Sequence, residues 1–220
     1  MIEEKTLAIT LKSIPFKDRS KIISLLTLDL GIISVIANVS SKKNSLIAFT
    51  TPFTISEVVI RRKRSELYTL KDVKVTNSNL HLRKSLLYLK VASKMIDAIF
   101  KSQFPKKNSK NIFLLLGKYL ENVSINPDAI YLSFLLKILL NDSMISPKEK
   151  CNNCKNIAST IDKGESLCIK CASHSSYIFD SDEYKTYLVL SQIRSFKYLK
   201  DLEITDKFRE RIFLLFKELV

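Results

Sequence analysis

The sequence predicts two kinds of structure in one chain: a five-stranded β-barrel of the OB type, then an all-α domain with an inserted four-cysteine zinc finger. Residues 1–75 carry short β-rich runs, and from Leu80 onward apolar residues recur at spacings of three and four. Four cysteines, the only ones among 220 residues, form two C-x-x-C pairs in a segment that interrupts the later helices. We therefore expect an α+β protein with domains at 1–78 and 79–220 and a zinc-binding insertion at 150–175.

The strand region consists of five short runs separated by turn residues. Asp29-Leu30-Gly31 separates the second run from the third and predicts a hairpin. A polar loop is expected at 38–45, and the basic stretch 62–65 separates the last two runs. Five short strands in this length fit a small barrel of the OB type. The expected strands are 6–11, 22–28, 32–37, 53–61 and 66–75.

The helical region begins with an amphipathic pattern that ends before Pro105. Ser109 can cap a second helix at 110–121, and Asn126-Pro127 provides an N-cap followed by proline for a third helix that reaches about Leu140. Helices resume after Ser181 and after Thr205. The basic stretch 101–110 is interpreted as a linker between helices.

The two C-x-x-C pairs predict one structural zinc ion bound by Cys151, Cys154, Cys168 and Cys171. A tight turn presents both sulfurs of a pair to one tetrahedral ion, and four protein sulfurs leave no open position for water or substrate. Two disulfides or a redox pair are the alternatives, but the chain has no secretion signal. His174 could replace one sulfur; with four thiols available, an ordinary surface histidine is the simpler interpretation.

Charge indicates a polyanionic partner. The chain holds 36 Lys and Arg against 22 Asp and Glu, a net charge of +14, and nucleic acid is the first candidate. The surplus lies in 1–78 and 79–150, whereas 151–220 is nearly neutral. Lysine richness from genome composition alone is the alternative. Every apolar run is too short for a membrane span, so we expect a cytoplasmic, nucleoid-associated protein without a membrane partner.

Three basic clusters on the expected barrel predict the DNA-binding surface. An OB barrel binds single strands by combining a positive groove with aromatic faces, and Phe16, Phe49, Phe53 and Tyr68 lie near the clusters, although Phe53 fits the core better than a stacking role. The predicted DNA-binding residues are Lys12, Lys17, Arg19 and Lys21; Lys42 and Lys43; and Arg61, Arg62, Lys63 and Arg64.

Enzyme motifs are missing from the sequence. The three isolated glycines cannot form a phosphate-binding loop of the Walker or dinucleotide type. A zinc deaminase would need H-x-E and a proline before the first cysteine pair, but Leu82-Arg83 follow His81 and Lys150 precedes Cys151. The carboxylates Asp180, Asp182 and Glu183 stand at the start of an expected helix, where capping explains them better than a magnesium site. No catalytic residues are predicted.

The order of these parts resembles the RecO family of bacterial recombination mediators. The resemblance is carried by the segments 11–22, 25–27 and 30–33, by Thr51-Pro52-Phe53-Thr54, by 67–70 and by the two cysteine pairs with Gly164 before the second. Two positions depart from the family pattern. Asn38 stands where a glycine is usual, and Lys163-Gly164 stands in place of a Gly-Gly pair.

The resemblance implies a non-enzymatic DNA repair protein. Such a protein binds single- and double-stranded DNA, anneals complementary strands and works with RecR to load RecA onto strands coated with single-stranded DNA-binding protein, whose C-terminal tail it captures. An RNA-binding zinc-ribbon factor of ribosome or transcription assembly is the main alternative. A zinc enzyme with an open site is a third.

Overall fold

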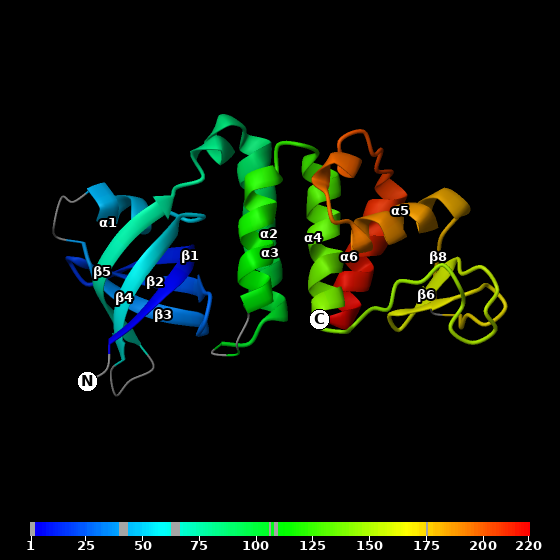
Figure 1. Cartoon of the computed structure of the whole chain (residues 1–220), viewed down its shortest axis with the longest axis horizontal. Coiled ribbons are helices and arrows are strands. Elements are labelled where there is room, and N and C mark those ends of the chain that lie inside the picture. The colour runs from blue at the N-terminus through cyan, green and yellow to red at the C-terminus, as the bar shows by residue number, and fades with distance from the viewer. Residues whose placement is uncertain (1–2, 40–43, 63–66, 106, 108–109, 175) are drawn as a thin grey trace. The chain divides into compact units, whose positions relative to one another are not determined.

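The computed structural model describes residues 3–39, 44–62, 67–105, 107, 110–174 and 176–220. The chain divides into two compact units, Met1–Glu121 and Asn122–Val220. The first unit holds the first five strands and the helices before its end at Glu121 (Figure 1). The second holds the remaining helices and the cysteine segment.

Five strands of the first unit form a closed barrel in the order β1-β2-β3-β5-β4. Every pairing is antiparallel except the one between β3 and β5, and β1 closes the ring because it pairs with both β2 and β4. The predicted OB-type barrel is confirmed. The strands are β1 (Glu3–Phe16), β2 (Ser20–Thr27), β3 (Gly31–Asn38), β4 (Ile55–Arg62) and β5 (Tyr68–Asn77).

Strand β1 is much longer than expected, because its two halves have different partners. Its first half pairs with β4 and its second half with β2, and the register shifts between Thr10 and Lys12. This shift is a β-bulge, in which the extra residue Leu11 has no partner in β2. The loose alternation of the sequence in this region reflects that irregularity.

The barrel interior is filled by aliphatic side chains and Tyr68, and Phe49 is fully buried in the same cluster. Phe49 belongs to the short helix α1 (Asn44–Phe49), which packs against β5. Threonine hydroxyls satisfy the end of this helix: Thr10 donates to the carbonyl of Phe49 at 2.7 Å and Thr54 to that of Ala48 at 2.9 Å. The expectation of a polar loop through residue 45 is wrong, because a helix begins at Asn44.

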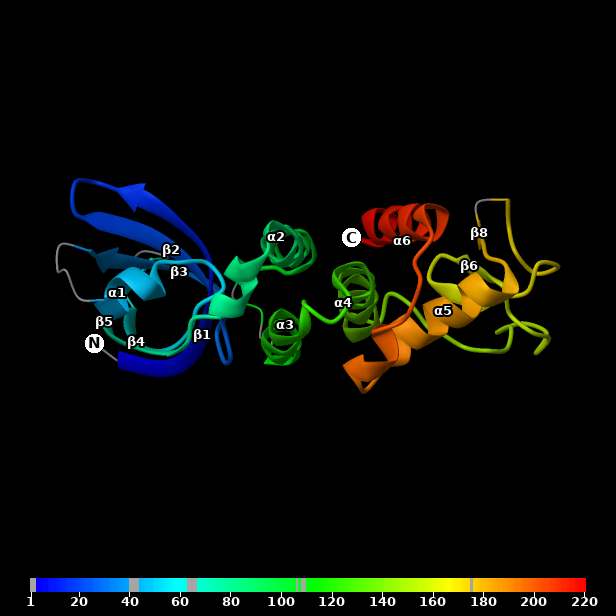
Figure 2. The same ribbon diagram turned by 90° about the horizontal axis from the view of Figure 1, so that it is seen from above.

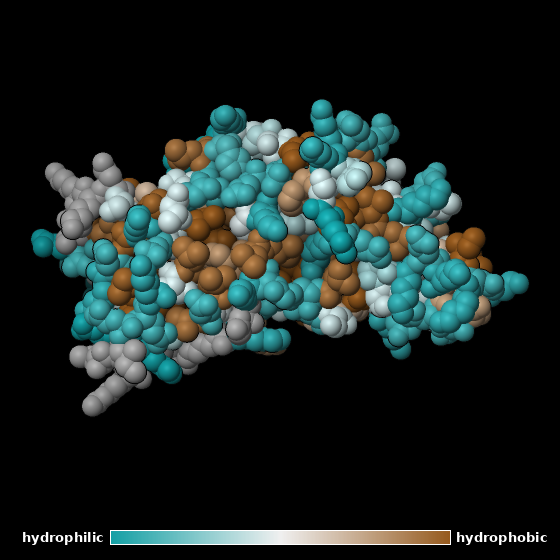
Figure 3. Space-filling view, in the orientation of Figure 1, coloured by the Kyte–Doolittle hydropathy of each residue, from teal (hydrophilic) through white to brown (hydrophobic). Residues whose placement is uncertain are grey.

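After the barrel come the 3-10 turn η1 (Leu80–Lys84), α2 (Leu86–Ser102) and α3 (Lys110–Asn122). The hydroxyl of Ser85 caps α2 by accepting from the N–H of Leu87 at 3.2 Å. The predicted cap Ser109 lies outside the described residues. Several apolar side chains of these helices are exposed, and hydrophobic surface gathers over this part of the view in Figure 3.

The second unit is built on α4 (Pro127–Asn141), which contacts α5 (Ser181–Gln192) and α6 (Asp206–Leu219). Asn126 caps α4 as predicted, by accepting from the N–H of Ala129 at 3.2 Å. Its side-chain nitrogen donates to the carbonyl of Leu199, the last residue of the 3-10 turn η2 (Phe196–Leu199), and to that of Leu202 in the loop after it. One asparagine thus starts a helix and fixes a distant loop.

The cysteine segment lies between α4 and α5, so the predicted insertion among helices is confirmed (Figures 1 and 2). It contains a small antiparallel sheet in the order β7-β6-β8, formed by Glu165–Leu167, Thr160–Asp162 and Tyr177–Ile178. Within the described part of the chain, no helix has the length and apolar character needed to cross a membrane.

Candidate metal centre and nucleic-acid interface

The two cysteine pairs lie in tight turns. In the first, the N–H of Lys155 donates to the carbonyl of Cys151 at 3.1 Å, and Lys155 has a left-handed φ of 64°. In the second, the N–H of Cys171 donates to the carbonyl of Cys168 at 3.0 Å. Each turn brings its two sulfurs to the same side, as the C-x-x-C spacing predicts.

The four sulfurs converge on one point. They lie within 4.8 Å of one another, and the sulfurs of Cys154 and Cys168 are 3.4 Å apart. A tetrahedral ion with metal–sulfur bonds of about 2.3 Å would separate its sulfurs by roughly 3.8 Å, whereas a disulfide needs about 2.05 Å. All four are free thiols. The geometry fits a single four-coordinate metal, and no disulfide joins these cysteines in the structure.

The pKa values of three cysteines are shifted, and not all in the same direction. The pKa of Cys151 is lowered to about 6, chiefly because the backbone N–H of Cys154 donates to its sulfur. Hydrogen bonding from the thiol of Cys154 also lowers the pKa of Cys168. The pKa of Cys171 is raised to about 12, first by its hydrogen bonds to Cys154 and Cys168. Four sulfurs this close cannot all ionise without a compensating cation, which a divalent metal would provide.

The surroundings favour a structural site. Cys151 and Cys168 are buried with Leu167, while Cys154 is exposed. His174 is exposed and does not belong to the group of potential ligands that the described residues form. An all-cysteine donor set leaves zinc no open position for catalysis.

A hairpin supports the second cysteine pair. Its two turn residues, Lys163 and Gly164, both have positive φ (47° and 85°), the backbone of a type I′ turn. A Cβ on Gly164 would lie 1.9 Å from the carbonyl oxygen of Met144, so only glycine fits there. The hydroxyl of Ser166 ties the hairpin to the preceding segment by donating to the carbonyl of Ser146 at 3.0 Å.

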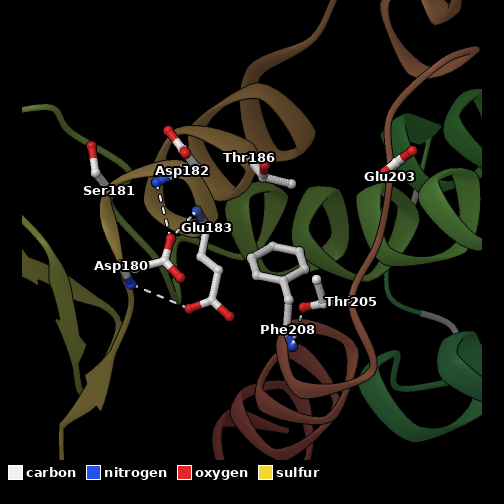
Figure 4. A pocket seen from close by; sticks show the side chains of 8 residues that line it. All are labelled: Asp180, Ser181, Asp182, Glu183, Thr186, Glu203, Thr205 and Phe208. Atoms are coloured by element: carbon white, nitrogen blue, oxygen red, sulfur yellow. Dashed lines mark hydrogen bonds between the residues drawn. The ribbon is translucent and has the colours of Figure 1, made fainter.

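Asp180 and Glu183, at the start of α5, form a capping box, as predicted, whereas the side chain of Asp182 pairs with Lys185. The carboxylate of Asp180 accepts from the N–H groups of Asp182 and Glu183 at 3.0 and 2.8 Å, and the side chain of Glu183 accepts from the N–H of Asp180 (Figure 4). Arg211 on α6 also donates to Glu183. Asp180, Asp182, Glu183 and Glu203 are the carboxylates that line a cavity of about 490 Å³. Those of Asp180 and Glu183 are engaged by backbone or arginine partners, and that of Asp182 pairs with Lys185.

The hairpin of β1 and β2 carries the first predicted DNA-binding cluster. Lys12, Lys17 and Arg19 are exposed, and Lys21 is half-buried with its Nζ donating to the hydroxyl of Thr50 at 3.5 Å. Lys17 has a left-handed φ of 56° in the turn, and its Nζ lies 5.5 Å from the ring centre of Phe16. The structure therefore brings these four cations onto one hairpin.

Arg61 and Arg62 lie elsewhere on the barrel, at the end of β4. Arg61 forms an ion pair with Glu3 at 2.6 Å, whereas the side chain of Arg62 is exposed. The other predicted cations are outside the described residues: Lys42, Lys43, Lys63 and Arg64.

The aromatic residues considered for base stacking divide into two groups. Phe49 and Tyr68 are buried in the barrel core and cannot receive a base. Phe53 is half-buried with a positive φ of 72°, and Phe16 is half-buried on the basic hairpin. Of the four aromatic residues, only Phe16 and, less favourably, Phe53 remain candidates for stacking on a base.

Sequence reasoning overlooked two exposed cations on β5. Lys71 and Lys74 point outward, although Glu57 stands opposite Lys74 in the ladder. The alternation of side chains along a strand could have identified them, since Leu70, Val73 and Val75 pack against the core.

Comparison with known proteins shows which family the chain resembles. Residues 1–79 match the family model described as Recombination protein O N terminal. Curated proteins named DNA repair protein RecO match over more of the chain. That of Caldicellulosiruptor bescii is 27% identical over 196 residues, 84% of this chain and 79% of the relative. The chain is therefore similar to RecO proteins over most of its length.

Other RecO proteins match to a similar degree. That of Chlamydia muridarum is 25% identical over 154 residues, 67% of this chain and 66% of that protein. That of Chlorobium phaeobacteroides is 27% identical over 175 residues, 75% of this chain and 66% of the relative. The family model covers β1 to β5, so the RecO N-terminal module coincides with the barrel.

Proposed function

We propose that this chain is a DNA repair and recombination mediator that binds single- and double-stranded DNA and anneals complementary strands without catalysing a reaction. In this proposal it works with RecR to load RecA onto strands coated with single-stranded DNA-binding protein, and it binds that protein's C-terminal tail. The observation that carries the proposal is the coincidence of the RecO N-terminal match with a barrel whose first hairpin exposes several cations.

Annealing requires a surface that relieves the repulsion between two polyanions. Lysine and arginine side chains do this by replacing the counterions of the phosphates, and no nucleotide hydrolysis is needed. Lys12, Lys17 and Arg19 extend from one hairpin into solvent and supply such a surface. We assign the DNA contacts to the ten predicted cations of the barrel, with this hairpin as the strongest candidate.

The cysteine cluster completes the proposal as a structural zinc site. Its chemistry fits one Zn²⁺ held by Cys151, Cys154, Cys168 and Cys171, and the ion would supply folding energy rather than a reaction centre. The segment 151–220 is almost neutral, so we place phosphate binding on the first unit.

Salt dependence of DNA binding tests the hairpin. Replacing Lys12, Lys17 and Arg19 together with alanine should weaken single-strand binding and flatten the plot of log affinity against log salt by about 2, since each phosphate contact contributes about 0.7. A control with the exposed Lys200, Lys207 and Lys217 changed to alanine removes the same charge from the second unit. An equal loss in both triple variants would mean that general charge, not this hairpin, binds DNA.

An annealing assay tests the activity as a whole. Complementary strands, bare or coated with single-stranded DNA-binding protein, should anneal faster with the full chain, and RecR should alter the coated reaction. A protein that ignores these substrates and prefers structured RNA would instead belong to the RNA-binding alternative.

A further inference from the structure

The segment between α2 and α3 holds an exposed aromatic ring on a fixed backbone. Phe104 is 74% exposed, against 41% for Phe100, the next most exposed phenylalanine of the described residues. A single exposed apolar side chain is ordinary on a protein surface. The anchoring of this one and the charge around it set it apart.

The backbone on both sides of the ring is tied to its surroundings. The N–H of Gln103 donates to the carbonyl of Ile99 at 2.9 Å, and the Gln103 side chain is buried. Pro105 forms a parallel β-bridge with Ile32, and the proline restricts Phe104 to an extended conformation. The ring therefore projects from a pre-set backbone.

Gly31 shows how closely this segment packs on the barrel. It has a left-handed φ of 69°, and a Cβ at this position would lie 2.1 Å from the carbonyl oxygen of Lys107. The turn between β2 and β3 and the backbone at Lys107 are thus in direct contact. This places Phe104 beside the end of the barrel formed by that turn.

The charge around the ring is positive. Lys101 and Lys107 are exposed on either side of Phe104, and between Asp97 and Glu121 the sequence contains five lysines and no acidic residue. Asp29, in the neighbouring turn, accepts a hydrogen bond from the hydroxyl of Thr6 at 2.8 Å. An aromatic face between lysines has the composition of a surface that stacks an unpaired base and holds its phosphates.

We propose that Phe104 is a base-stacking residue for single-stranded DNA, with Lys101 and Lys107 binding the adjacent phosphates. The inference rests on the proposed DNA-binding function and extends it beyond the predicted cations. The basic hairpin lies at the other end of β2, whose eight residues span roughly 26 Å. A strand that runs along the barrel would then contact lysines and arginines at one end and an aromatic ring at the other.

Stacking predicts a preference that electrostatic binding alone does not give. Bases in a duplex already stack on each other, so Phe104 should contribute to binding of single strands and little to binding of duplex DNA. We expect Phe104→Ala to weaken binding of an oligothymidylate roughly 10-fold, a typical effect of losing one stacked base. The slope of log affinity against log salt and the duplex affinity should be unchanged, and Phe104→Tyr should bind as the native chain does.

The chain contains no tryptophan, so a direct probe is available. In Phe104→Trp the single indole should be quenched by oligothymidylate but not by heparin, a polyanion without bases. Leu86→Trp, at a position 67% exposed on α2, is the matched control and should not be quenched. Thermal unfolding of each variant verifies that the fold is retained.

The outcomes separate the two proposals. If the native chain binds and anneals DNA while Phe104→Ala does so equally well and the indole is not quenched, the stacking role is wrong and the mediator function stands. An equal loss for single strands and duplex would also overturn stacking. If the native chain binds no DNA, both proposals fail.

Discussion

The barrel and the cysteine segment are both small β structures, yet different forces hold them together. The barrel encloses a continuous cluster of aliphatic side chains that includes the fully buried Phe49. The cluster around the cysteines consists of Cys151, Leu167 and Cys168, with Cys171 against it. So small an apolar cluster cannot offset the entropy of ordering its segment. Under the proposed function, a zinc ion bound by the four converging sulfurs would supply the missing stabilisation.

The two regions also differ in charge. Residues 1–78 carry 13 basic and 7 acidic side chains, whereas residues 151–220 carry 11 and 10. The region with the large apolar core is thus the one with the positive surplus, and the region with the four-cysteine cluster is nearly neutral. Stability of the metal site and DNA binding should therefore be separable.

The largest effect is expected from removing a ligand of the proposed metal site. Structural zinc contributes on the order of 10 kcal/mol to the domain that binds it, so Cys168→Ser should unfold the segment around β6 and β7 while the barrel stays folded. Hydrogen exchange followed by mass spectrometry can read both regions in one sample. Asn153→Ser, within the first cysteine pair but without a ligand sulfur, should exchange like the native chain. Faster exchange in β1 and β2 of Cys168→Ser would show that the barrel depends on the metal too.

Truncating the barrel core is the corresponding change in the first unit. Phe49→Ala removes a fully buried ring and should cost about 3–5 kcal/mol of unfolding free energy, because a cavity remains. Zinc content measured after dialysis should not change. Ile47→Ala, on the same helix at a position 53% exposed, should cost far less in a denaturant titration. Equal losses at the two positions would argue against the described placement of α1.

The smallest and most local changes in stability are expected from glycine substitutions. Gly164→Ala should destabilise the cysteine segment by about 1–3 kcal/mol or more, since φ is 85° and the carbonyl of Met144 blocks the new methyl group. Gly117→Ala, inside α3 with nothing within 4 Å of the new Cβ, should stabilise by up to about 1 kcal/mol. Opposite shifts of the two melting temperatures are expected, and shifts of the same sign would contradict the described backbone.

The sequence predicted those parts of the fold that depend on local chemistry. The pair Asn126-Pro127 is a sufficient local signal for the start of a helix, because the amide oxygen of Asn126 accepts from an N–H of the first turn and proline fits the first helical position. Asp180 and Glu183 form a capping box for the same reason. The cysteine cluster could also be predicted, since the ligand spacing determines the geometry.

The parts that were missed depend on contacts distant in sequence. Helix α1 has only six residues, too few for a periodic pattern, and its carbonyls are satisfied by Thr10 and Thr54 from other elements. The exposure of Phe104 follows from the bridge between Pro105 and Ile32. No property of the local sequence reveals that Pro105 and Lys107 lie against the barrel.

The bulge in β1 determines which way the basic hairpin presents its charge. Before the bulge, even-numbered residues such as Ala8 face the core, and after it Ser13 stands opposite the buried Ile23. After Leu11 the odd-numbered residues face the core in place of the even-numbered ones, so Lys12 faces solvent. If Leu11 were paired in a regular ladder instead of forming the bulge, the same sequence would direct Lys12 into an apolar interior. The bulge thus reverses which side chains of β1 face solvent, and the ability of the hairpin to bind a polyanion depends on it.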